Sequence, residues 1–204
     1  MEGELTVQSE VGKGSTFTLW LPAAVQGSNA PPEEHESWPR AEGTRLVGLT
    51  RIGYALHREL DAVLEGFVER LRGEALVPNI RALPFGQLAD HLSSYVTTVG
   101  TSLMAVEEGQ GQPSGLVADG SDILRILADR HGVQRQRLGW TRPALEREWQ
   151  LLSDELHRAM ERAASASASA VAESALVEAG TIVDRYLEHA RDTSLQSFAR
   201  AAWK

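Results

Sequence analysis

The sequence predicts a mainly α-helical bundle that is preceded by a short β-hairpin. Residues 1–22 alternate apolar and polar side chains around a glycine-containing turn, which is the period of β-strands. Residues 23–43 are rich in proline, glycine and glutamate and are typical of a flexible linker. From residue 44 onward, apolar residues recur every three or four positions, as in amphipathic helices that bury their apolar faces against one another. We therefore expect a hairpin at 1–22, a linker at 23–43 and a helical domain at 44–204.

The composition excludes several classes of protein. Of the 204 residues, 42% are hydrophobic and 24% are charged, as in ordinary globular proteins. The formal charge of −8 argues against binding of nucleic acid through its phosphates, and the absence of cysteine excludes disulfides and thiolate metal sites. No apolar run is long enough to span a membrane, and the first residues lack the pattern of a signal peptide. We expect a cytoplasmic protein with no nucleic-acid or membrane partner.

The hairpin is predicted from residues 5–9 and 16–21, which alternate on either side of the turn at 12–15. Pro22 ends the second strand, because proline cannot donate to a strand ladder. A two-stranded hairpin is marginally stable alone, so these residues need a larger sheet to join.

The helices are predicted from apolar stripes that step by three and four residues. The stripes run from Leu49 to Leu71, Leu88 to Leu103, Leu124 to Leu138, Leu145 to Met160 and Val171 to Phe198. Pro84 fits the first turn of the second helix, and Thr141 is the expected N-cap of the fourth, with Pro143 just inside it. The glycine-rich residues 109–115 predict a long loop between the second and third helices.

Residues 2–22, EGELTVQSEVGKGSTFTLWLP, resemble the last glycine box of sensor histidine kinases. The resemblance implies that Gly12, Gly14, Ser15 and Thr16 lie where the lid-side loop of that α/β ATPase domain approaches the ATP phosphates. Glycines there let backbone N–H groups come close to an anion. The asparagine box, the D-x-G-x-G box and the phosphoacceptor helix of the family would precede this hairpin and are absent from the chain. We expect the C-terminal part of a longer kinase, or a truncated gene product, with no ATP binding or kinase activity of its own.

Residues 60–162 are similar to the N-terminal sensor domain of RsbR-type co-antagonist proteins. The similarity rests on PNIRALP at 78–84, LADHL at 88–92, ADRHGVQRQRLGW at 128–140 and ALEREWQLL at 144–152. It implies a globin-like helical fold without haem, usually dimeric, that serves as an input module. The partners implied are a second copy of the chain, a kinase catalytic core in cis or in trans, and a response regulator.

His131 is the sharpest candidate for a functional residue. It falls on an apolar stripe, with Arg135 one turn further along and Glu148 on the next predicted helix. In a globin-type fold a histidine at such a position can ligate iron. The alternative is a core histidine that is hydrogen-bonded to a neighbour such as Glu148. We take His131, Arg135, Glu148 and Trp149 as the candidate sensor pocket.

Other candidates favour plain structural roles. The aromatic residues at helical spacing are either core or the lining of an apolar pocket; they are Tyr95, Trp140, Trp149 and Tyr186. His57 is followed by Arg-Glu-Leu, which resembles a phosphoacceptor motif with its acid displaced, and we interpret it as part of a solvated helix face. The remaining histidines lack zinc-site spacing, and no catalytic constellation is present, so we expect no metal and no catalytic residues.

These observations predict a non-catalytic, sensory C-terminal part of a two-component histidine kinase that transmits a signal to an attached kinase core. It needs no cofactor of its own, and ATP belongs only to the complete kinase. Two alternatives stay open: a haem-binding gas sensor that uses His131, and a kinase fragment that supplies its lid segment in trans.

Overall fold

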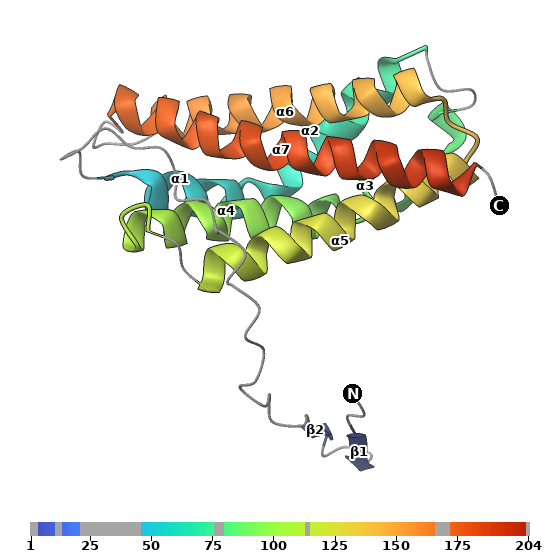
Figure 1. Cartoon of the computed structure of the whole chain (residues 1–204), viewed down its shortest axis with the longest axis horizontal. Helices are drawn as coiled ribbons and strands as arrows, with labels where there is room; N and C mark the ends of the chain where they lie inside the picture. Colours follow the sequence, from blue (N-terminus) through green and yellow to red (C-terminus); the bar gives the residue numbers. More distant parts are fainter. Residues whose placement is uncertain are drawn as a thin grey trace, which may run out of the picture. The chain divides into compact units, whose positions relative to one another are not determined.

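The computed structural model describes residues 4–10, 14–20, 46–75, 80–112, 115–165 and 172–202 (Figure 1). The chain divides into two units, Met1–Glu34 and His35–Lys204. The predicted linker at 23–43 lies outside the described residues.

The first unit contains two antiparallel strands, β1 (Glu4–Glu10) and β2 (Gly14–Trp20). Their register pairs Val7 with Phe17 at the centre of the ladder. Of the four candidate phosphate-side residues, Gly14, Ser15 and Thr16 form the start of β2, and Gly12 lies outside the described residues.

The second unit is helical, and its long helices lie side by side as a bundle (Figure 1). Its elements are α1 (Leu49–Arg58), α2 (Leu60–Gly73), the 3₁₀ turn η1 (Ile80–Ala82), α3 (Phe85–Ala89), α4 (Leu92–Glu108), α5 (Gly115–Arg137), α6 (Arg142–Ser165) and α7 (Glu173–Ala201). The apolar stripes that predicted the helices form one core. The prediction of a mainly α-helical bundle is therefore confirmed. Among the described helices, none is both long and apolar enough to cross a membrane.

Two of the predicted helices are interrupted. The first apolar stripe is split at Glu59 between α1 and α2, and the second is split at Asp90 and His91 between α3 and α4. Asp90 has φ 35° and ψ −120°, a conformation that non-glycine residues rarely adopt. The apolar residues on both sides of each interruption still pack in the core, so the apolar periodicity does not reveal the breaks.

Signals at the helix ends were partly right. The Thr141 hydroxyl accepts a hydrogen bond from the Ala144 N–H at 3.4 Å, which confirms Thr141 as an N-cap. Pro84 caps α3 instead of lying in its first turn. The loop expected at 109–115 is shorter than predicted, because α5 already begins at Gly115.

Two pairs of helices approach closely where they meet at small residues. On α5, a Cβ added to Gly132 would collide with the Ser194 carbonyl on α7, and on α1 a Cβ at Gly53 would collide with the Gly100 carbonyl on α4. His57, which the sequence predicts on a solvated helix face, is half-buried at the same crossing. Its ring packs on Gly100, and its Nε2 lies 2.9 Å from the Thr97 carbonyl oxygen.

Candidate functional site

Three of the predicted site residues form a buried ionic cluster. Arg135 and His131 come from α5 and Glu148 from α6, and their exposed fractions are 0%, 2% and 1%. Arg135 donates from Nη2 to Glu148 Oε1 at 2.7 Å and from Nε to both carboxylate oxygens at 3.0 Å. Nε2 of His131 lies 3.0 Å from Glu148 Oε2. The carboxylate is therefore shared by a guanidinium and an imidazole.

Arg135 also holds the end of α3. Its Nη1 donates to the Gln87 carbonyl and its Nη2 to the Leu88 carbonyl, both at 2.8 Å. Both carbonyls belong to the last turn of α3, whose carbonyl groups lack partners within the helix and favour a nearby cation. Nη1 further donates to Gln134 Oε1 at 2.7 Å. The side chain thus joins α5 and α6 to the end of α3.

The backbone at the end of α5 positions a ring on Arg135. Gly139 has φ 75°, the Gly139 N–H bonds the Gln136 carbonyl, and the Trp140 N–H bonds the Arg135 carbonyl. These two hydrogen bonds form a Schellman motif, which requires a left-handed residue. The motif turns Trp140 back over its own helix, with the Arg135 guanidinium carbon 4.7 Å from its ring centroid.

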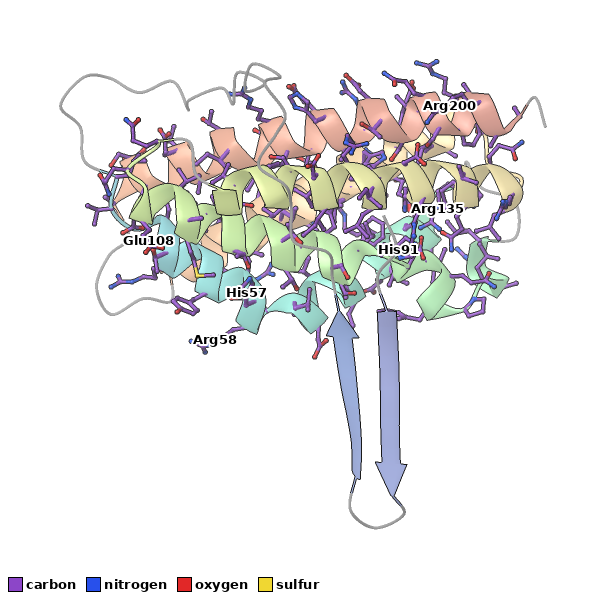
Figure 2. The ribbon with its side chains drawn as sticks, turned by 60° about the horizontal axis from the view of Figure 1, so that its bottom comes forward. His57, Arg58, His91, Glu108, Arg135 and Arg200 are labelled. Carbon is purple, nitrogen blue, oxygen red and sulfur yellow. The ribbon has the colours of Figure 1, made fainter. Side chains whose placement is uncertain are left out.

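A second carboxylate faces His131 from the break between α3 and α4. Nδ1 of His131 lies 3.8 Å from Asp90 Oδ2, and the other Asp90 oxygen lies 3.5 Å from His91 Nε2. Both Nδ1 and Oδ2 are buried without a hydrogen bond. The sequence gives no local sign that Asp90 belongs to the site, because its approach to His131 depends on the positive φ at the helix break. Figure 2 shows Arg135 and the neighbouring His91 near one end of the bundle.

Trp149 completes the cluster on its apolar side. Its ring meets the rings of His131 and Tyr95 edge to face, with centroids 5.3 Å and 5.5 Å apart. Trp140 and Tyr186 are buried as well. An open surface hollow of about 510 Å³ is lined by Leu46, Val47, Thr50, Glu107, Glu108 and Gln110. The aromatic residues of the cluster contribute to the core and not to this hollow.

The electrostatics keep both carboxyl groups ionised. Burial alone would raise the pKa of Glu148, but Arg135 and His131 outweigh burial and the pKa lies below its usual value. Partial burial alone would raise the pKa of Asp90 as well, but His131, His91 and Arg135 outweigh it and this pKa is also lowered. Burial raises the pKa of Tyr95 well above its usual value, so this phenol stays neutral.

The arrangement bears on what His131 can bind. Ligation of iron through Nε2 would require the ring to leave Glu148, and Nδ1 faces Asp90. Among the described residues, no group of three or more acidic or histidine side chains is arranged to hold a metal ion. What the cluster can do chemically is store charge and exchange a proton at the imidazole.

No family model, curated protein or solved structure matches this chain.

Proposed function

We propose that residues 46–202 form a non-catalytic sensory module that regulates a histidine-kinase core, and that residues 1–22 are the last hairpin of that kinase's ATPase domain. The observation that carries the sensory role is the buried cluster of Arg135, Glu148, His131 and Asp90 at a helix break. A buried ionic cluster is costly to desolvate and is often no more stabilising than apolar side chains of similar volume. We infer that the cluster favours one packing arrangement of the surrounding helices over another.

Helix α4 offers a route from this cluster to the point where the chain enters the bundle. At one end α4 begins directly after Asp90 and His91. At its other end, Glu107 Oε2 accepts hydrogen bonds from the Gly48 and Thr50 N–H groups at 3.0 and 2.6 Å. Its 17 residues span about 25 Å. Figure 2 places His91 and Glu108 toward opposite ends of the bundle.

The contacts at the entry point tie the chain to the C-terminal end of α4 and to the turn that follows it. The Gln110 side chain accepts from the Leu46 N–H and donates to the Leu46 carbonyl, each at 3.0 Å. Gly48, the N-cap residue of α1, has no side chain that could accept a hydrogen bond from the first turn, and the Glu107 carboxylate accepts it instead. A shift of α4 therefore moves residues 46–50, which follow the linker. Signal transfer is then a shift between two populations of helix packing that a ligand or partner favours unequally.

Further features of the proposal come from the resemblances. They are a globin-like arrangement of the helices, a kinase core in cis or in trans, a response regulator downstream and a homodimer. We place the dimer contact on the outward face of α7 (Glu173–Ala201), where Val177 is exposed, because the apolar stripe of this helix is packed into the core of its own chain. Sedimentation analysis at tens of micromolar is expected to give a dimer, and a monomer would refute this contact.

The regulatory role is tested by joining the chain to a complete histidine-kinase core, with residues 1–22 in place of its own last hairpin. Glu148→Gln removes the shared charge, and we expect it to change autophosphorylation about fivefold or more, the lower range of coupling between sites. The matched control is Glu146→Gln on the same helix, whose carboxylate makes an exposed ion pair with Arg142 at 3.0 Å. Equal rates for both variants would refute the regulatory role. Binding of an ATP analogue by the chain without this core would instead favour a lid supplied in trans.

A further inference from the structure

Five side chains form a continuous series of acids and bases from the surface into the core. The series runs through His91, Asp90, His131, Glu148 and Arg135. Its outer member, the His91 side chain, is 38% exposed, and the Asp90 side chain is 10% exposed. The series therefore connects a half-exposed histidine at the surface with a buried imidazole.

The two carboxylates place unequal demands on the ring of His131. A carboxylate only accepts hydrogen bonds, so the 3.0 Å contact with Glu148 requires a hydrogen on Nε2. A neutral ring then has a lone pair on Nδ1, and this lone pair faces the Asp90 carboxylate 3.8 Å away. A protonated ring presents N–H groups to both acids. Proton loss thus turns the contact with Asp90 from attraction into repulsion.

The other groups around His131 hold the charge of the cluster in place. Arg135 on α5 stays charged and is bonded to Glu148 on α6, while His91 faces Asp90 at the helix break. From α4, Tyr95 touches Trp149 and is neutral. His131 is the group in contact with both acids, through Nε2 toward Glu148 and through Nδ1 toward Asp90.

Asp90 is the point at which this change acts on the backbone. It lies between α3 and α4 with φ 35°, a conformation that requires support from its surroundings. Its carboxylate Oδ2 is buried and has no hydrogen bond. Attraction to a protonated His131 supplies such support, and a neutral ring removes it.

We propose that the junction of α3 and α4 is a proton-responsive switch, in which protonation of His131 holds Asp90 against α5 and deprotonation releases the junction. The inference rests on the proposed sensory function and names its signal as the proton. Released at the junction, α4 can shift and carry the change to residues 46–50 through Glu107.

The test follows the ring and the backbone of the full chain by NMR between about pH 5 and 8. The ring nitrogens of His131 report its protonation, and the amide signals of residues 85–92 report the junction. We expect the amide signals to shift with the same midpoint as the ring. Trp149 fluorescence gives a second readout, because a protonated imidazole quenches an indole that it touches, and Trp149→Phe removes this contribution.

Three variants separate the switch from a general effect of pH. His131→Gln keeps an amide donor for Glu148 but cannot titrate, and we expect it to abolish the shift at 85–92. Asp90→Asn removes the facing charge, and we expect His131 still to titrate while the pH-dependent shift of the junction signals becomes smaller. His91→Gln is the control at the exposed end, and we expect the midpoint measured at the junction to persist.

Junction signals that stay constant in the wild type, or that titrate unchanged in folded His131→Gln, would overturn the switch. This outcome is distinct from failure of the sensory role. If Glu148→Gln alters autophosphorylation while the junction ignores pH, the module regulates in response to another signal.

Discussion

Removal of the shared carboxylate should destabilise the protein strongly. Glu148→Leu leaves the fully buried Arg135 without its carboxylate partner, and breaking a buried ion pair costs about 3–5 kcal/mol. Arg135 keeps its bonds to the Gln87 and Leu88 carbonyls and to Gln134, so we expect the lower value, about 3 kcal/mol. For a domain of this size the loss corresponds to about 6–12 °C in Tm. Urea unfolding followed by circular dichroism measures the free energy, and thermal melting checks it.

A double variant tests the cause of this loss. Arg135→Met with Glu148→Leu removes both charges, and an apolar pair of similar volume often replaces a buried ion pair at little cost. In this variant the Gln87 carbonyl, the Leu88 carbonyl and His131 each lose one hydrogen bond worth about 1 kcal/mol. We expect the double variant to lose less unfolding free energy than the two single variants lose together, by about 2 kcal/mol or more. A loss below about 1 kcal/mol in Glu148→Leu, or strict additivity of the two changes, would refute the reasoning.

Three further predictions concern pH, backbone conformation and haem. The pKa values of Glu148 and Asp90 are lowered in the folded protein, so the stabilisation from these two carboxylates is complete when the pH is above their ordinary pKa values. This stabilisation is lost as the pH falls through the pKa values of the folded protein. The free energy of unfolding, measured from pH 6 downward, should therefore decline below about pH 4.5, and a flat profile would contradict this. Gly139→Ala places a Cβ at φ 75° and should lower the free energy of unfolding by about 1–2 kcal/mol. Gly86→Ala, in a helix with open space around this position, should raise the free energy of unfolding by up to about 1 kcal/mol. Equal effects of the two substitutions in melting curves would argue against the Schellman motif. Titration with hemin should give no stoichiometric Soret band, because His131 is engaged by two carboxylates, and a band that is lost in His131→Gln would establish haem binding.

The fold could be predicted from the sequence where the physics is local. Apolar stripes such as Leu145 to Met160 fixed the helices, because burial of one face determines helical periodicity. The Thr141 cap could be predicted because its hydroxyl accepts a hydrogen bond from an N–H group only three residues later in the sequence. The interruption at Asp90 was not readable, because Leu88 and Leu92 lie on the same face whether or not the helix continues between them.

The candidate site follows the same division. Arg135 one turn after His131, and an acid on the next helix, predicted a core network, and the structure places these side chains together. The role of Asp90 could not be predicted, because it depends on a backbone conformation imposed by tertiary contacts. The carbonyl contacts of Arg135 on α3 are likewise a product of packing between distant segments.

The length of α3 explains why the ionic cluster controls the junction beside it. Five residues are too few to form a stable helix alone, so the position of α3 depends on what binds it. Arg135 supplies two of those contacts through the carbonyls of Gln87 and Leu88. The orientation of Arg135 is in turn fixed by Glu148, which also binds His131. A change of charge at His131 therefore reaches the junction twice, directly through Asp90 and indirectly through Glu148 and Arg135. Loss of Asp90 alone should leave the second path in place, so hydrogen exchange of the α3 amides should be faster in Glu148→Leu than in Asp90→Asn; equal rates would exclude the path through Arg135.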